Sequence, residues 1–272
     1  MIAHYEHHVA IRKNHFCPFK FAQEANILAC PCNWHKNIEI LLITDGYGTL
    51  QYGADRYTLH TGDLAVINSG ALHRVESERG IHYYYLIVDE SFWLENGLDP
   101  ATYTFERLFR DAHTEALFQH VAAQAQHHAA SDDPLSTAML RNAVLALLVE
   151  LCTHHAAPKP PKPSTATAAE EYVKSTLDYI NDNLARPLTL DLLAARCGIT
   201  KYHLARAFKR YTGQTVFTYL NTLRCLEAEL CIANGMSVTQ AAFENGFDSL
   251  PYFSRTYKRL IGTSPSHIKP RA

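Results

Sequence analysis

The sequence predicts an α+β protein of two domains, an N-terminal β-barrel with flanking helices and a C-terminal domain built only of helices. The chain has 272 residues, more than the roughly 100–150 that one domain usually holds. Short apolar runs separated by glycine turns fill residues 1–90, whereas apolar residues recur at helical spacing from about residue 101. Proline, lysine, serine and threonine then replace any periodic pattern over residues 156–169, which separates the two domains.

The charge of the chain is distributed unevenly between these domains. Residues 170–272 carry 13 Lys and Arg against 9 Asp and Glu, while residues 1–169 carry 12 against 18. A polyanion is therefore expected to bind the C-terminal domain. The hydrophobic content of 47% argues against an intrinsically disordered chain. Because no apolar run reaches the ~18–20 residues that span a bilayer and the first residues hold no signal-peptide core, we expect a cytoplasmic protein without a membrane partner.

Residues 1–155 are predicted to form one domain in which strands are followed by helices. Dipeptides such as Asp45-Gly46 mark turns between runs rich in Ile, Leu, Val and Tyr, which is typical of a small barrel. The segment Asp133-Pro134 is a helix start, with a capping side chain and a proline in the first turn. The apolar residues after it recur at helical spacing: Leu135, Met139, Val144, Leu147, Leu148 and Leu151. Such a stripe either covers one side of the barrel or forms the seam of a homodimer, and the sequence does not separate these roles.

Residues 156–169 are predicted to be an exposed linker, and residues 170–272 contain an internal repeat. The segment Ala194-x-x-x-Gly198 recurs 48 residues later as Ala242-x-x-x-Gly246. The pattern Arg-x-(Phe/Tyr)-Lys-Arg at 206–210 recurs 49 residues later at 255–259. A small residue at a helix crossing, a glycine turn and a second helix are what a helix-turn-helix requires. Recognition helices are therefore predicted at about 201–211 and 250–260.

One helix is predicted to connect the two modules. Apolar residues recur at helical spacing from Thr215, a capping residue, to Asn234-Gly235, a helix end. About eighteen residues at ~1.5 Å each span ~27 Å, close to the ~34 Å between successive major grooves on one face of DNA. The spacing therefore predicts that the two recognition helices read adjacent grooves.

These residues resemble the AraC family of bacterial transcription regulators. The resemblance covers about residues 172–268 and includes the pattern Leu223-Arg224-x-x-x-Ala228, together with LTLDLLAARCGITKYHLARAFKRYTG and SVTQAAFENGFDSLPYFSRTYKRLIGTSP. It implies double-stranded DNA, a small-molecule effector and RNA polymerase as partners, with activation as the more frequent mode. Ala241 stands where the family usually has a larger aliphatic residue, which predicts looser packing in the second module.

The resemblance also implies which side chains contact DNA. Residues early in each recognition helix are expected to reach base edges: Tyr202, Ala205, Arg206, Leu250, Pro251, Ser254 and Arg255. Phosphate contacts are expected from Lys201, Lys209, Arg210, Ser249, Lys258 and Arg259. Arg206 and Arg255 can each pair with guanine or instead bind a phosphate. Because Leu250 and Pro251 donate no side-chain hydrogen bond, the second module is expected to discriminate less between sequences.

Part of the N-terminal domain resembles the cupin barrel that often precedes such modules. His35-x-x-x-Glu39 and His73 match the two cupin motifs, but Asn33 stands in place of another histidine and Asn68 in place of a proline. The side chains expected to line an effector pocket are His35, Glu39, His73, Tyr83 and Tyr85. The first three are also a possible metal-ligand set. Because Asn33 interrupts the full quartet of ligands, we expect no metal or other cofactor.

The leading interpretation is a sequence-specific DNA-binding transcription regulator, not an enzyme, that forms a homodimer and responds to an effector in its barrel. A metal-dependent cupin enzyme or a metal sensor fused to a DNA-binding module is the alternative from another class. A third interpretation is a constitutive DNA-binding protein whose barrel serves only assembly. Metal analysis and ligand-dependent DNA binding separate the three.

Overall fold

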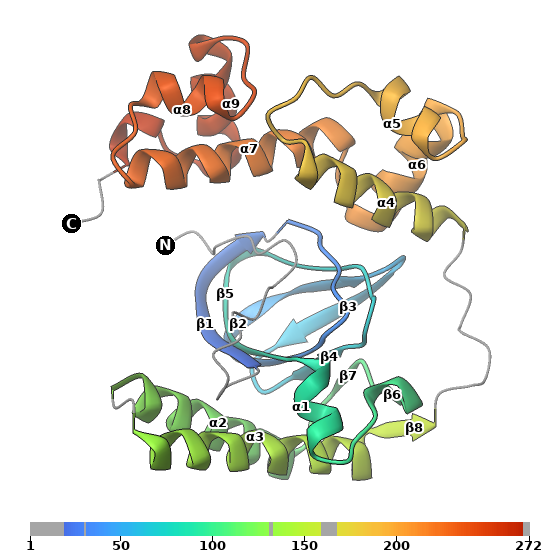
Figure 1. Ribbon diagram of the computed structural model, residues 1–272, viewed down its shortest axis with the longest axis vertical. Coiled ribbons are helices and arrows are strands. Elements are labelled where there is room, and N and C mark those ends of the chain that lie inside the picture. Colours follow the sequence, from blue (N-terminus) through green and yellow to red (C-terminus); the bar gives the residue numbers. More distant parts are fainter. Residues whose placement is uncertain (1–18, 30, 131–132, 159–167, 269–272) are drawn as a thin grey trace. The chain divides into compact units, whose positions relative to one another are not determined.

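The computed structural model describes residues 19–29, 31–130, 133–158 and 168–268, and these residues form two compact units (Figure 1). The first unit is a curled β-sheet with helices, and the second consists of helices. The prediction of two domains in an α+β protein is therefore confirmed. The boundary between the units falls at residues 165 and 166. Most of the predicted linker, residues 159–167, lies outside the described residues.

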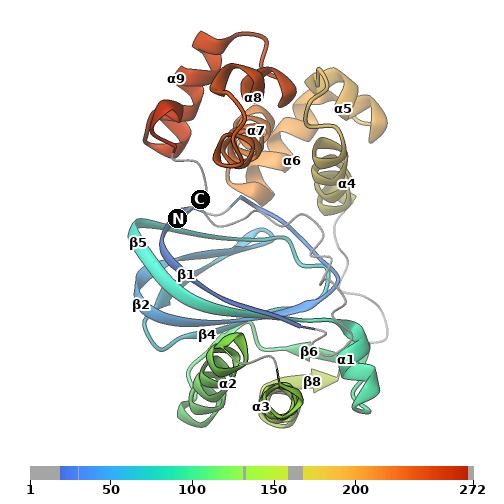
Figure 2. The ribbon, with the colours of Figure 1, turned by 60° about the vertical axis from the view of Figure 1, so that its left-hand side comes forward.

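Antiparallel pairing organises the first unit. Its main sheet has the strand order β1-β5-β2-β4-β7, with β3 paired to β2. These strands are β1 (Phe19–Ala29), β2 (Ile38–Tyr52), β3 (Asp55–His60), β4 (Leu64–Ile67), β5 (His73–Val88) and β7 (Leu108–Phe109). The register of β2 on β5 shifts between Ile43 and Asp45 and again between Gly46 and Thr49. Such bulges bend a strand, and both strands curl around the inside of the unit (Figures 1 and 2).

Glycine is required where this bend brings backbones together. A Cβ at Gly46, whose φ is +85°, would lie 2.8 Å from the carbonyl oxygen of Gly80. A Cβ at Gly48 would lie 2.6 Å from the carbonyl oxygen of Glu76. The turn signal read from Asp45-Gly46 therefore marks a bend within one long strand, not the end of a strand.

Two long helices pack side by side against the outer face of the curled sheet (Figures 1 and 2). The remaining elements of the unit are α1 (Glu90–Glu95), a 3-10 turn (Pro100–Thr102), β6 (Tyr103–Phe105), α2 (Ala112–Ala130), α3 (Pro134–His154) and β8 (Ala156–Pro158). Alternate residues of β2, such as Ile38, Ile40 and Leu42, are buried in one cluster with Leu147 and Leu148 of α3. The other residues of β2, starting with Glu39, therefore face the inside of the barrel.

The apolar stripe predicted for α3 divides between two environments. Val144, Leu147, Leu148 and Leu151 are fully buried against the sheet and α2, whereas Leu135 is 69% and Met139 is 43% exposed. The helix therefore covers the barrel with one face and leaves a second apolar face open. Within the described residues α3 is the one helix long and apolar enough to cross a membrane, and one face of it is buried in the core of the unit.

The predicted limits of the linker are wrong at its start. Residues 156–158 form β8, which pairs with β6 and so belongs to the first unit. Pro158 is tolerated there because β8 is an edge strand with a single neighbour. The second unit also begins earlier than predicted, since its first helix starts at Ala168 and not at residue 170.

The second unit contains the two predicted modules and the helix between them. Its helices are α4 (Ala168–Asp182), α5 (Leu190–Arg196), α6 (Lys201–Thr212), α7 (Val216–Ala233), α8 (Val238–Glu244) and α9 (Leu250–Ile261), followed by a 3-10 turn (Pro265–His267). Each of α5 to α9 has a serine or threonine N-cap: Thr189, Thr200, Thr215, Ser237 and Ser249. Each cap accepts a hydrogen bond from a backbone N–H of the first turn. The predicted recognition helices and spacer therefore lie within one or two residues of α6, α9 and α7.

Candidate nucleic-acid interface and effector site

The first recognition helix, α6, has one buried face and one basic face. Leu204 and Phe208 are fully buried in the unit, and Tyr211 is 5% exposed. On the opposite face Tyr202 is 74% exposed, and Arg206 is also exposed. The apolar side of α6 therefore packs against the unit. The side chains predicted to contact bases and phosphates remain accessible on the other side. Ala205 is half-buried, and Lys209 and Arg210 are exposed.

The second recognition helix, α9, repeats this arrangement. Phe253 and Tyr257 are buried in the core of the second module, and Ala241 is fully buried in the same cluster. The side chains predicted to meet DNA lie on the remaining surface, where Pro251, Arg255, Lys258 and Arg259 are exposed and Leu250 and Ser254 are half-buried. Both modules therefore present equivalent surfaces, as the sequence repeat predicts.

Lys201 and Ser249, both predicted to contact phosphates, already have partners within the protein. The Nζ of Lys201 lies 3.0 Å from a carboxylate oxygen of Asp191, and this hydrogen bond and charge raise the pKa of Lys201. The hydroxyl of Ser249 accepts a hydrogen bond from the N–H of Tyr252 and caps α9. The predicted phosphate contact of Lys201 would require it to leave Asp191, and Ser249 has a structural role as the cap of α9.

Arg224 of α7 connects the two modules through its guanidinium group. This side chain is buried, with 8% of the residue exposed. Its Nε donates to the carbonyl oxygen of Leu184 at 2.8 Å, and its Nη2 donates to that of Arg186 at 2.8 Å. Both carbonyls belong to the loop that leads into α5. The Nη1 donates to the carbonyl oxygen of Gly246 at 2.7 Å, in the turn between α8 and α9. One side chain therefore ties the entry of the first module to the turn of the second.

Gly246 is needed for this connection as well as for the turn itself. Its φ is +80°, which favours glycine, and a Cβ would lie 2.9 Å from the guanidinium carbon of Arg224 and from the carbonyl oxygen of Ala185. Burial lowers the pKa of Arg224, although the charge of Asp248 opposes this. The sequence pattern identified both residues, but their contact joins segments too far apart in the chain to be predicted.

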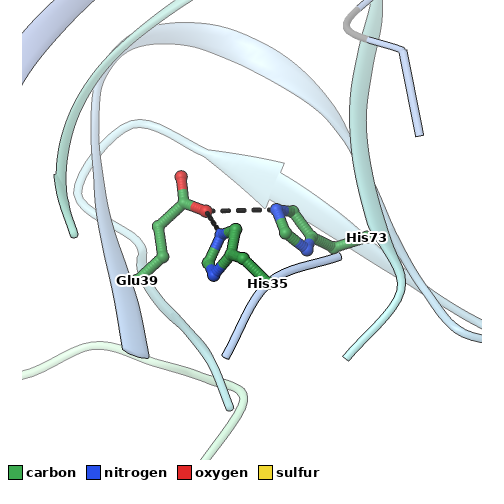
Figure 3. A group of neighbouring side chains, drawn as sticks. All are labelled: His35, Glu39 and His73. Carbon is green, nitrogen blue, oxygen red and sulfur yellow. Dashed lines mark hydrogen bonds and ion pairs between the residues drawn. The ribbon is translucent and has the colours of Figure 1, made fainter. Parts of the chain in front are cut away.

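Three of the five predicted effector-pocket residues meet inside the first unit. His35 Nε2 and His73 Nε2 lie 3.0 and 3.1 Å from the same carboxylate oxygen of Glu39 (Figure 3). All three residues are buried. Burial alone would raise the pKa of Glu39, but the hydrogen bonds and charges of the two histidines outweigh it and hold this pKa below its usual range. Two histidines and a carboxylate at one point are a set that can hold a divalent metal.

Tyr83 and Tyr85 lie on the same sheet face as Glu39. Tyr85 pairs with Leu41, and Ile87 pairs with Glu39, so alternation along β5 turns Tyr83, Tyr85 and Ile87 toward the inside. Both tyrosines are mostly buried. The predicted effector residues thus share the inner surface of the barrel, with the tyrosines further along the strands than the histidines.

A cleft of about 360 Å³ lies on the other side of the same sheet. It is lined by residues of β2, β5 and α2 and by the turn after β3, among them Leu42, Tyr84, Glu115, Gln119 and Gln126. None of the five predicted effector residues lines it. The inner surface of the barrel and this outer cleft are therefore separate features of the first unit.

Comparisons with known proteins agree with both halves of this description. The family model of the AraC-like ligand binding domain matches residues 22–144, and a helix-turn-helix domain model matches residues 193–271. The multiple antibiotic resistance protein MarA of Escherichia coli is 33% identical over 94 residues, which are 34% of this chain and 74% of MarA. The transcriptional activator AarP of Providencia stuartii is 35% identical over 96 residues, 35% of this chain and 70% of AarP.

A further relative matches most of both chains. The HTH-type transcriptional regulator YbfI of Bacillus subtilis is 26% identical over 225 residues, which are 80% of this chain and 78% of YbfI. Its alignment is too long to fall within one unit alone. The chain is a DNA-binding transcription regulator of the AraC family, with an N-terminal ligand-binding domain and a C-terminal helix-turn-helix domain.

Proposed function

We propose that a small molecule binds the inner surface of the barrel, near Glu39, Tyr83 and Tyr85, and changes how the C-terminal unit occupies its operator. The main support for DNA binding is that α6 and α9 each present a basic face. Helix α7 connects these two helices, and its Arg224 forms hydrogen bonds with both modules. An effector shifts this occupancy only if it binds the free and DNA-bound arrangements with unequal affinity. The protein then acts in the cytoplasm as a regulator and not as an enzyme.

Activation through contact with RNA polymerase is part of the same proposal. AarP, one of the relatives, is named a transcriptional activator. Leu192 on α5 and Phe243 on α8 are 40% and 52% exposed, on helices that precede the recognition helices and carry none of the predicted DNA contacts. These helices leave apolar surface for a protein partner while α6 and α9 lie in the grooves.

The open face of α3 supports a homodimer. Leu135, Asn142 and Val149 recur every seven residues, and Leu135 and Val149 are 69% and 47% exposed. Met139 and Ala146 lie beside them and are also exposed. A seven-residue repeat of this kind is the spacing that pairs helices in a coiled coil, and a self-complementary face closes into a twofold dimer. A second copy of the chain therefore covers this face, which is distinct from the buried face that includes Leu147.

The proposed base reading is tested by removing two cations of α6 separately. Arg206→Ala is expected to cost roughly 1–3 kcal/mol on the cognate site and to relax base preference at one position, because a bidentate contact to guanine discriminates by about that amount. Lys209→Ala is expected to weaken binding to cognate and random DNA alike, because phosphates carry no sequence information. Arg206 is exposed, and among the described residues it forms no ion pair, so the substitution is expected to leave the fold of α6 intact.

The measurement is a titration of each full-length variant on the cognate site and on random DNA at one salt concentration. Arg186→Ala is the control, since it removes an exposed cation from the loop before α5 and keeps the backbone carbonyl that Arg224 uses. Equal losses on both DNAs for Arg206→Ala would make Arg206 a phosphate contact.

A further inference from the structure

Three side chains that can bind a metal meet at one end of the helices that cover the barrel. Asp111 directly precedes α2, Glu150 lies near the end of α3, and His155 is the C-cap of α3. One ligand atom of each lies within 4.8 Å of the other two. Because α2 and α3 pack on the outer face of the sheet, this group is separate from the inner surface of the barrel (Figures 1 and 2).

The two carboxylates of this group lie together without a basic side chain to neutralise them. The Glu150 side chain is 15% exposed, and Asp111 is half-buried. Among the described residues neither forms an ion pair with a lysine or an arginine. Thr114 orients Asp111, because its backbone N–H and its hydroxyl donate to Oδ1 at 2.7 and 2.8 Å. Two like charges this close repel one another, and a cation between them removes the repulsion.

Two histidines lie near the same oxygen of Glu150 without a hydrogen bond to it. His113 Nε2 is 3.8 Å and His154 Nε2 is 3.9 Å from Glu150 Oε2. A hydrogen bond between nitrogen and oxygen is roughly 2.7–3.2 Å long. The ligand atoms of a zinc ion lie about 2.0–2.2 Å from it, so two of them can be as much as about 4.2 Å apart. These separations therefore fit atoms that share an ion better than atoms that share a proton.

His155 is held in place by its neighbours. Its ring stacks on that of Phe109, with the centroids 3.8 Å apart and the planes at 12°. Its Nε2 lies 3.2 Å from the hydroxyl of Thr114, and its Nδ1 lies 3.6 Å from a carboxylate oxygen of Glu106. This Nδ1 is buried and has no hydrogen-bond partner among the described residues. Whichever nitrogen binds an ion, the other keeps a polar neighbour, as the histidines of metal sites usually do.

We propose that Asp111, Glu150 and His155 bind one divalent transition-metal ion, with His113 or His154 as a fourth ligand. Imidazole together with carboxylate suits zinc, cobalt and nickel, whereas calcium and magnesium take oxygen ligands. The side chains of His113 and His154 are 70% and 60% exposed, so either can turn toward the ion without repacking the core.

Such an ion connects the start of α2 to the end of α3, directly before β8 and the last described residues of the first unit. The ligands lie outside the barrel motif on which the expectation of no metal rests. Metal binding here is also independent of the proposed effector and of DNA, because none of these residues belongs to either proposed site.

The buried group of His35, Glu39 and His73 provides a matched control, because it can also hold a metal. Glu150→Gln and Glu39→Gln are the same chemical change in the two groups, and each keeps the shape of its side chain. Asp111→Asn keeps the oxygen that caps the first turn of α2 through Thr114. These substitutions therefore remove charge from one group at a time with little change in packing.

The experiment titrates Zn²⁺ and Co²⁺ into metal-free, tag-free full-length protein, followed by calorimetry, Co²⁺ absorption and thermal unfolding. Wild type is expected to bind an ion and to unfold at a higher temperature when loaded. Glu150→Gln and Asp111→Asn are expected to weaken this binding by more than about 100-fold, beyond the 10–100-fold typical of an outer partner. Replacing His113 and His154 together by alanine is expected to weaken it less. Glu39→Gln is expected to leave it unchanged.

The proposal is overturned if wild type binds no ion, or if Glu150→Gln and Asp111→Asn bind it as tightly as wild type. It is also overturned if the ion is lost in folded Glu39→Gln and kept in Glu150→Gln, since the barrel then holds it. Circular dichroism of each metal-free variant shows whether loss of metal reflects loss of fold. DNA binding by the same samples separates this outcome from a failure of the proposed function, because a protein that binds its operator but no metal refutes only the metal site.

Discussion

Leu147→Asp is expected to unfold the N-terminal unit, whereas Val149→Asp is expected to leave it folded and to produce monomers. Leu147 is fully buried in the cluster between the sheet, α2 and α3. Removing such a side chain costs roughly 2–5 kcal/mol, and an unpaired charge in its place adds several more. Together these losses are comparable to the ~5–15 kcal/mol that stabilise a typical domain. Val149 is 47% exposed on the open face of α3, where a charge meets water in the monomer.

Thermal unfolding followed by circular dichroism, together with the molar mass of each variant in solution, checks this pair. A folded Leu147→Asp protein with the wild-type unfolding temperature would contradict the core assignment of Leu147. A Val149→Asp protein that remains dimeric would eliminate the open face of α3 as the seam. The sequence alone does not distinguish Leu147 from the other residues of the stripe as part of a dimer seam. Because Leu147 is buried in the core of its own unit, it cannot belong to that seam.

Arg224→Met is expected to destabilise the C-terminal unit by roughly 2–5 kcal/mol and to weaken operator binding further. The substitution keeps a long apolar stem but leaves the carbonyls of Leu184, Arg186 and Gly246 without their donor. A fully buried polar group left unsatisfied costs about 1–3 kcal/mol, and the total for these three carbonyls is expected to fall below three times that range because Arg186 is exposed and Leu184 and Gly246 are half-buried. Because these carbonyls belong to both modules, the recognition helices also lose a contact that supports the spacing set by α7. The two recognition helices can enter adjacent major grooves only if that spacing is kept.

Denaturant unfolding of the full chain and titration on operators with altered spacing between half-sites measure the two effects. Wild type is expected to prefer one spacing, and Arg224→Met to bind several spacings with similar, weaker affinity. Arg224→Lys keeps the charge but lacks the planar fork, so an intermediate loss is expected. Wild-type stability and wild-type spacing preference in Arg224→Met would show that Arg224 does not couple the modules.

Local signals in the sequence were sufficient to predict the C-terminal unit. Caps at Thr189, Thr215 and Ser249 and a glycine at 198 and 246 act within a few residues of their own position, so their pattern can be read directly. The spacing of Glu39 from His35 is equally local, and it identified two of the three residues that meet in the barrel.

Contacts between distant segments could not be predicted in the same way. The carbonyls bound by Arg224 lie 22 to 40 residues from it along the chain. The division of α3 into a buried and an open face depends on where the sheet lies, because apolar residues on both faces fit helical spacing. Strand β8 pairs with β6 across some fifty residues, and its alanines and proline carry no strand pattern. The antiparallel bridge between Asn33 and His73 joins residues 40 positions apart, which sequence spacing does not give.

The most direct test of the account is the affinity of the full chain for genomic sites mapped in cells, measured against random DNA over a range of salt concentrations. The account predicts specific binding in the range of ~10⁻⁸–10⁻¹¹ M at physiological salt, at least about 10³ times tighter than to random DNA. Five cationic phosphate contacts are predicted, and they imply a slope of about −4.5 in log affinity against log salt: Lys201, Lys209, Arg210, Lys258 and Arg259. Folded protein that binds mapped and random DNA equally, or that binds neither at low salt, would contradict the assignment of α6 and α9 as the surfaces that read DNA.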